Sequence, residues 1–250
     1  MIAMLLAWGE RLDGNFLREE RHMGTFKRFA LIASVFLVAG FLTGCNLLSL
    51  PFFIFGPEPK VEPEMKQIGS REKRDEVSVV VLTYAGPETR PEFIKVDRDL
   101  AARIAVEMRK AFEYNEERVK VVSPSKVEKF KQDHLNWQTM ELADIGKHFA
   151  ANYVVYVELD NDTLALYERG SGRELFRGHA DYTVTLVDVH EPEDGTQHKQ
   201  FSYNYPSEAK AIHASDTTVI LFKQKFLEQI AKKVAWCVTS HPTKDGYVEE

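Results

Sequence analysis

From residue 77 onward, apolar residues fall into short continuous runs and longer amphipathic stretches. Residues 77–84 and 153–159 are β-branched runs, too short for a helix and too continuous for a half-exposed strand, so we expect two central buried strands. Between them, apolar residues recur at spacings of three and four over residues 97–112. The pattern therefore predicts a buried strand, an amphipathic helix of about four turns and a second buried strand.

Shorter elements are predicted between this helix and the second central strand. Residues 119–122 form a strand-like run that ends at Ser123-Pro124, a capping residue followed by the proline that suits a first helical position. We expect a short helix there and another over residues 141–149, where apolar positions again recur at helical spacing.

Turn residues and alternating patterns dominate the stretch after residue 159. Asn161-Asp162 separates two strand-like runs, which predicts a two-residue hairpin turn. A long alternating strand runs through residues 180–189, and a last strand covers residues 197–205. The chain then closes with a helix whose buried face is marked at helical spacing by Val219, Phe222, Phe226 and Ile230.

This order of elements predicts an α/β (α+β) fold. We expect a mixed β-sheet of about five to six strands with helices packed on its faces. Residues 77–240 would form a single globular domain, followed by a flexible tail over residues 241–250. The chain is 44% apolar and 28% charged, so it has enough apolar residues to fill the core of such a domain.

The beginning of the chain has the pattern of a secretory signal helix. Lys27 and Arg28 precede residues 29–42, an uncharged run of fourteen residues. A membrane-spanning helix needs about 20 apolar residues, whereas a short apolar run behind basic residues is typical of a signal peptide. We therefore predict that residues 1–44 are a signal peptide region.

The end of this region, Leu42-Thr43-Gly44-Cys45, resembles the bacterial lipobox. In lipoproteins with this motif the cysteine is lipidated and cleavage falls before it. The resemblance implies that Cys45 carries acyl chains and holds the protein to a lipid bilayer. The alternative is an uncleaved anchor helix that continues to about Phe55, and both alternatives place the rest of the chain outside the cytoplasm.

Residues 1–22 are unusual ahead of such a signal, because four of them are acidic. A signal normally starts with a short basic stretch. Met23 lies directly before a stretch of this kind, so we expect translation to begin at Met23.

Residues 45–76 are expected to connect the anchor to the domain. The apolar segment 47–55 either lies among the lipid headgroups or packs on the folded domain, and the sequence leaves both open. Proline and charge dominate the following residues, which favours an extended linker up to about Glu76. Asn46 stands where an Asp would resemble an inner-membrane retention signal, so we expect the outer membrane, facing the periplasm, rather than the inner one.

Charge and cysteine content exclude some functions. The net charge is −6, and the chain from Cys45 onward carries −7, because the 44 residues before it hold five basic and four acidic side chains. No basic surface is therefore predicted that could neutralise the phosphates of a nucleic acid. If Cys45 is acylated, Cys237 has no disulfide partner, and we expect it to be a small buried hydrophobic residue.

Residues 77–83, 143–155 and 183–189 carry a further resemblance. Together they resemble the envelope domain shared by the N-terminal part of TolB, the curli secretion lipoprotein CsgG and the LpoB-type activators of peptidoglycan synthases. This chain departs from the pattern at Ala151-Asn152 and in a longer turn over residues 191–196. The resemblance implies a non-enzymatic adaptor that docks on another envelope protein.

The sequence contains histidines and carboxylates that could take part in catalysis or metal binding, but it contains no motif for a metal, a cofactor or a nucleophile. The best trio of histidines, His179, His190 and His198, lacks the ligand spacing of a metal site, and we expect neither a metal nor a cofactor. A carboxylate pair across the sheet is conceivable, with Asp181 on one strand and Glu158 or Asp160 on another. This pair keeps open the alternative of an extracytoplasmic, hydrolase-like enzyme whose site is assembled from residues distant in sequence.

Four aromatic residues are the candidate binding residues. Phe201, Tyr203 and Tyr205 share one face of a strand, and Tyr182 could extend them into an adhesive patch beside a sheet edge. The other interpretation is that this face meets the last helix. The function we expect is a membrane-tethered, non-enzymatic binding or assembly module for another envelope protein.

Overall fold

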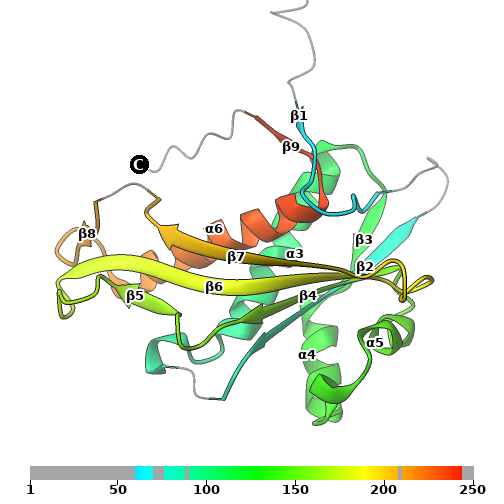
Figure 1. The fold of residues 1–250 in the computed structure, drawn as a ribbon, viewed down its shortest axis with the longest axis horizontal. Coiled ribbons are helices and arrows are strands. Elements are labelled where there is room, and N and C mark those ends of the chain that lie inside the picture. Colours follow the sequence, from blue (N-terminus) through cyan, green and yellow to red (C-terminus); the bar gives the residue numbers. More distant parts are fainter. Residues whose placement is uncertain (1–59, 70–75, 88–89, 208–209, 244–250) are drawn as a thin grey trace, which may run out of the picture. The chain divides into compact units, whose positions relative to one another are not determined.

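The computed structural model describes residues 60–69, 76–87, 90–207 and 210–243, and it confirms the expected mixed β-sheet with helices on its faces (Figure 1). The strands of the main sheet are β2 (Val77–Ala85), β3 (Val119–Val121), β4 (Tyr153–Leu159), β5 (Ala165–Tyr167), β6 (Leu175–Asp188), β7 (Gln197–Tyr205) and β8 (Ile212–His213). The helices are α3 (Val96–Tyr114), α4 (Pro124–Asp133), α5 (Leu142–His148) and α6 (Val219–Val238), with short 3-10 helices at Pro91–Phe93 and Trp137–Thr139. None of the helices in the described ranges is both long and apolar enough to cross a bilayer.

The strand order explains why the sheet is mixed. β2 lies between β3 and β4 and is parallel to both, whereas β4 pairs antiparallel with β6. β6 is 14 residues long and also pairs antiparallel with β5, β7 and β8. β6 is therefore the strand on which the whole second half of the sheet is built.

The turn at Asn161-Asp162 does not form the predicted hairpin. β4 and β5, which it connects, do not pair with each other, because both pair with β6: Leu159 lies opposite Tyr182, and Ala165 opposite His179. The length of β6 allows two shorter strands to follow each other along one edge. The turn between them is held locally, by the Asp160 carboxylate, which accepts a hydrogen bond of 3.0 Å from the backbone N–H of Asp162.

Residues 60–69, which the sequence assigned to the linker, pack on the domain. Lys60–Val61 forms strand β1 and pairs antiparallel with β9 (His241–Pro242), which lies in the predicted flexible tail. The backbone N–H groups of Met65 and Ile68 donate to carbonyls at the end of α6 at 2.9 and 2.8 Å, and both side chains are buried. This stretch contains a proline and several charged residues, but two of its apolar residues, Met65 and Ile68, belong to the core.

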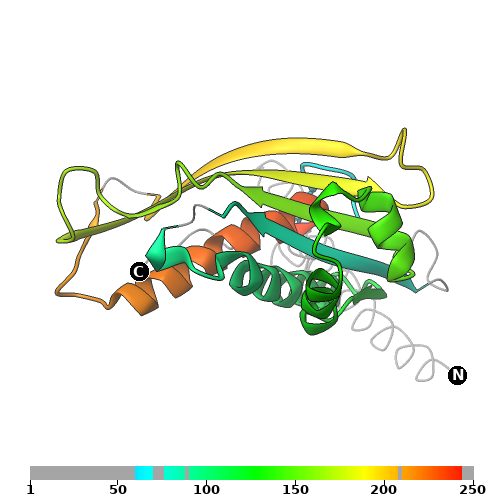
Figure 2. The ribbon, with the colours of Figure 1, turned by 90° about the horizontal axis from the view of Figure 1, so that it is seen from below.

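The first face of the sheet is covered along its length by α3 and α6 (Figure 2). Phe226 of α6 is fully buried there, with its ring directly over Gly178 of β6. A Cβ atom at Gly178 would lie 2.6 Å from the Phe226 ring, so only glycine allows this close approach of helix and strand. The main hydrophobic core of the protein lies between this face and the two helices.

Candidate functional site

The second face of the sheet is divided into a covered half and an open half. In the covered half, α4 and α5 pack over Val80, Leu82 and Val154, which are completely buried. Gly146 of α5 permits this packing, because a Cβ atom there would lie 2.4 Å from Val189. Beyond these helices most of the exposed or half-exposed side chains are polar, and we call this region the open sheet face.

The alternation along β6 explains the open sheet face. From Phe176 to Thr185, apolar side chains point to the first face and polar ones to the second, and from Val184 onward the strand is buried on both faces. A period of two places every second residue on the same face of a strand. Strand β6 therefore changes from half-exposed to fully buried at the point where α5 begins to cover it.

One row of polar side chains crosses four strands of the open sheet face. The strand register places Tyr84 of β2 opposite Glu158 of β4, Glu158 opposite Thr183 of β6, and Thr183 opposite Gln200 of β7. Glu158 and Gln200 are exposed, and the other two are half-buried. The row presents a phenol, a carboxylate, a hydroxyl and an amide side by side.

The row lines a surface hollow of about 770 Å³. Besides the row, Asp160, Asn161, Asp181 and Ser202 contribute to its walls. The backbone N–H of Asp160 donates to the carbonyl oxygen of Asp181 at 2.9 Å, which holds these two acidic residues next to each other. The hollow thus brings together Glu158, Asp160 and Asp181, the carboxylates that the sequence analysis considered as a pair across the sheet.

Tyr156, in the next row of β4, is half-buried at the edge of this surface, where it packs against the core under α4 and α5. Burial raises the pKa of its phenol well above the ordinary value, and the nearby Glu158 carboxylate and Tyr84 raise it further. A tyrosine phenol is neutral at pH 7, and the raised pKa keeps it neutral at higher pH as well. Neutral hydroxyl and amide groups recognise polar ligands by hydrogen bonds, and the carboxylates add a preference for cationic groups.

The three histidines singled out in the sequence are not brought together. His198 and His179 lie on the open sheet face, where their Nδ1 atoms are 2.9 Å from Thr185 Oγ1 and 2.8 Å from Asn204 Oδ1. His190 lies in the turn after β6 and contacts the Asn152 amide at 3.1 Å. Within the described ranges, no group of three or more His, Cys, Asp or Glu side chains could hold a metal ion.

The four aromatic residues do not form the predicted adhesive patch. Tyr182, Tyr203 and Tyr205 are 3%, 6% and 5% exposed, and they pack toward α6. The ring centroid of Tyr203 is 6.3 Å from that of Phe226, and that of Tyr205 is 5.5 Å from that of Phe222. The alternative interpretation, that this strand face meets the last helix, is therefore correct, because α6 covers the first face up to β7.

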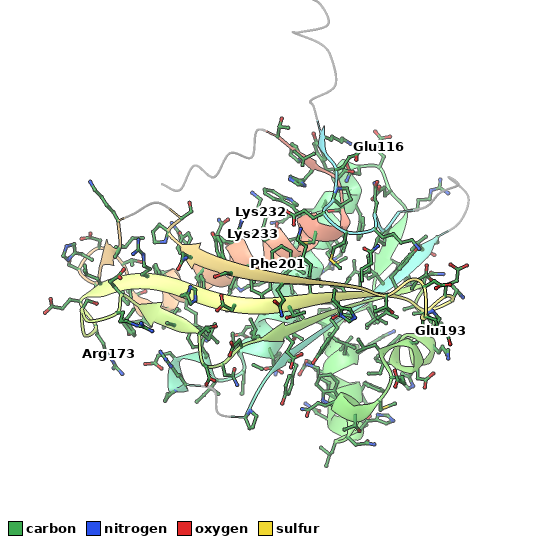
Figure 3. All side chains as sticks on the ribbon, viewed as in Figure 1. Glu116, Arg173, Glu193, Phe201, Lys232 and Lys233 are labelled. Carbon is green, nitrogen blue, oxygen red and sulfur yellow. The ribbon has the colours of Figure 1, made fainter. Side chains whose placement is uncertain are left out.

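Phe201 is the one member of this group that is half-exposed. Its ring stacks on Tyr182 at a centroid distance of 5.3 Å, and Lys199 Nζ lies 5.5 Å from the centroid of the Phe201 ring. Phe201 lies on β7, and Lys232 and Lys233 lie on α6, the helix that covers this face of the sheet (Figure 3). Phe201 therefore marks the outer limit of the core, where the first face reaches solvent.

Cys237 is buried in α6, as expected for a free cysteine in an apolar run. It is 3% exposed, and its thiol donates to the carbonyl oxygen of Lys233 at 3.0 Å. Burial raises the pKa of the thiol to about 12, which keeps it protonated and unreactive. Cys45, the predicted lipidation site, lies outside the described residues together with its lipobox and the apolar segment 47–55.

No known family model and no curated protein matches this chain. Among solved structures, it is similar to the PelC dodecamer from Paraburkholderia phytofirmans, with 11% identity over 72% of this chain and 96% of that one and a TM-score of 0.35. It is also similar to the lipoprotein GNA1162 from Neisseria meningitidis, with 13% identity over 62% and 98% of the two chains and a TM-score of 0.36. It is also similar to the rare lipoprotein B from Shewanella oneidensis, with 13% identity over 63% of this chain and 89% of that one and a TM-score of 0.27.

Proposed function

We propose that this chain is a lipoprotein of the bacterial envelope, anchored in a bilayer through acylated Cys45, whose domain is a non-enzymatic binding module for another envelope protein. The observation that carries the proposal is the open sheet face. The helices α3 and α6 bury the first face of the sheet. The second face would need a similar cover only where its side chains are apolar, and on the open sheet face most of them are polar. The face is therefore stable in water and available to a ligand.

The open sheet face is suited to a polar protein surface. Its hydroxyl, amide and carboxylate groups lie in adjacent strands at fixed spacing, so a docking protein meets a rigid array rather than a mobile loop. Glu158, Asp160 and Asp181 favour a surface that carries lysine or arginine. In the proposed setting the anchor places this face near the outer membrane, on its periplasmic side.

Photo-crosslinking from the open sheet face tests the binding role. The full chain carries p-benzoylphenylalanine in place of Thr183 or Glu158, and the matched control carries it at Lys129, an exposed residue of α4. We expect both probes on the open sheet face to capture the same envelope protein in intact cells and the Lys129 probe to capture none. Recovery of no protein from either position would overturn the proposal.

Metabolic labelling with an alkyne-bearing palmitate tests the anchor. We expect the full chain to take up the label and the Cys45→Ser chain to lose it. Cys237→Ser is the matched control, because it removes the other cysteine, which is buried, and should keep the label. Equal labelling of the parent and Cys45→Ser chains would show that the proposed anchor is wrong.

The three carboxylates in the hollow support a second candidate, an extracytoplasmic hydrolase. Acid and base catalysis by two carboxylates requires different surroundings that give the two groups different pKa values. Glu158 and Asp160, however, are both exposed to solvent. In such a hydrolase, Asp181→Asn would reduce turnover by about a hundredfold or more. The binding module predicts no turnover in either chain, so an activity that Asp181→Asn abolishes would favour the hydrolase.

A further inference from the structure

Strand β7 forms an edge of the main sheet. It pairs with β6 over nine residues, and no other strand of the described residues pairs with it (Figure 2). An edge strand presents backbone N–H and C=O groups that can pair with a further strand. At nine residues β7 is longer than the typical strand of about five to six residues, so it offers a long template for pairing.

Among the described residues, the second half of this edge lacks the charges and prolines by which proteins prevent such pairing. Charged side chains and prolines within an edge strand discourage contact with another strand. Here Lys199 is the one charged residue of β7, and Glu64 already pairs with it in an ion pair. Pro206 follows the strand rather than interrupting it. Residues 200–205 therefore form an uncharged edge.

We propose that β7 pairs antiparallel with β7 of a second copy of this chain, about a two-fold axis at Ser202. In this register Gln200 lies opposite Asn204 of the second copy, and Phe201 lies opposite its Tyr203. Amide then faces amide, which is a favourable cross-strand pair, and the half-exposed Phe201 lies beside Tyr203, which stays buried against α6. Lys199 lies opposite Tyr205, so no two charged residues of β7 lie opposite each other.

The surroundings of β7 favour a two-fold axis at Ser202 over an axis nearer the start of the strand. The backbone N–H of Lys66 donates to the Gln197 side chain at 2.7 Å, so the segment before residue 69 lies beside the first residues of β7. Pairing over residues 199–205 leaves Gln197 outside the interface, and Lys199, which pairs with Glu64 of this segment, lies at its margin. Because a two-fold interface joins one patch to itself, the patch must be self-complementary, and residues 199–205 meet this requirement.

A disulfide across the axis tests the pairing directly. Opposite residues of an antiparallel pair have Cα atoms about 4.5 to 5.5 Å apart, which lies within the range for disulfides. The full chain with Ser202→Cys is oxidised in isolated membranes, and we expect a covalent dimer at the expense of most of the monomer. Ser215→Cys is the matched control, because Ser215 is also an exposed serine but lies away from β7, and it should give no dimer above the parent chain.

A charge at the same position gives an independent test. Ser202→Glu would place two carboxylates across the axis, and we expect detergent-solubilised dimer to dissociate at least tenfold more readily than the parent, as measured by sedimentation. Ser215→Glu should sediment as the parent does. The proposal is overturned if Ser202→Cys crosslinks to a different protein or to nothing, or if Ser202→Glu leaves the dimer unchanged.

Discussion

The two faces of the main sheet are built from the same strands and have opposite characters. The first face is apolar along its length and is covered by α3 and α6, whereas the second is mainly apolar where α4 and α5 cover it and mainly polar elsewhere. On β6 the two characters alternate residue by residue, with Tyr182 buried and Thr183 half-exposed. We infer that the first face provides most of the folding stability and that the open half of the second face is available for binding.

Removing a large side chain from the first face should have the largest effect. Phe226 is fully buried between Gly178 and the rings of Tyr203 and Tyr205, so Phe226→Ala leaves a cavity in the main core. We expect it to lower the free energy of unfolding by about 3–5 kcal/mol, as measured by urea titration followed by circular dichroism. Thr183→Ala on the open sheet face is the comparison, with an expected change of about 0.5 kcal/mol or less. Similar losses for both variants would contradict the assignment of stability to the first face.

Adding a single methyl group to the first face should have the next largest effect. Gly178→Ala places a Cβ atom 2.6 Å from the Phe226 ring, which forces the helix and the strand apart. The expected cost is about 1–3 kcal/mol in the same titration.

A double variant shows whether the loss arises from this contact. Gly178→Ala together with Phe226→Leu should lose less stability than the sum of the two single variants, because the smaller side chain leaves room for the methyl group. Strict additivity would argue against a clash between the two positions.

The ion pair at the covered end of β6 should contribute less, and its contribution should depend on pH. Lys66 Nζ lies 2.8 Å from Asp188 Oδ2. Burial acts to raise the pKa of Asp188, but the hydrogen bonds from Lys66 and from the backbone N–H of His190 outweigh it, so the pKa is lowered. We expect Asp188→Asn to cost about 1 kcal/mol at pH 7.

The sign of the pH dependence follows from the lowered pKa. A carboxyl group whose pKa is lower in the folded state adds stability above its unfolded pKa, near 3.8, and loses it as the pH falls through the folded value. The difference between Asp188→Asn and the parent should therefore be constant above about pH 5 and shrink below pH 4. A difference that is as large at pH 3 as at pH 7 would mean that the residue acts through packing rather than charge.

The elements with a strong local pattern could be predicted from the sequence. The β-branched run at residues 153–159 coincides with β4, and the apolar repeat over 97–112 lies within α3. The wrong prediction of a hairpin at Asn161-Asp162 has a physical reason. β4 and β5 both pair with β6 because β6 is long enough for both, and the alternating pattern does not show where β6 begins. The core positions of Met65 and Ile68 were missed because the prolines and charges around them have the composition of a linker.

The candidate site was predicted only in part, for a related reason. Periodicity showed that Phe201, Tyr203 and Tyr205 share a face, but it could not show which face α6 covers. The sequence also suggested Glu158, Asp160 and Asp181 as neighbours, and the hollow contains all three. Thr183 and Gln200 gave no signal of their own, because threonine and glutamine on an alternating strand are typical of any exposed sheet surface. Their row is visible only once the register of four strands is known.

The smallest effect on stability should come from the open sheet face, together with the largest effect on binding. Glu158→Gln with Thr183→Ala changes the charge and the hydroxyl of the polar row and disturbs no buried apolar group. We expect the free energy of unfolding to change by about 0.5 kcal/mol or less. Recovery of the envelope protein after crosslinking of intact cells should fall about tenfold, which corresponds to about 1.4 kcal/mol of binding free energy. Lys129→Gln, on the exposed side of α4, should change neither quantity. If the double variant instead lost stability and kept its partner, the open sheet face would be a structural surface, and the binding site would have to lie elsewhere on the domain.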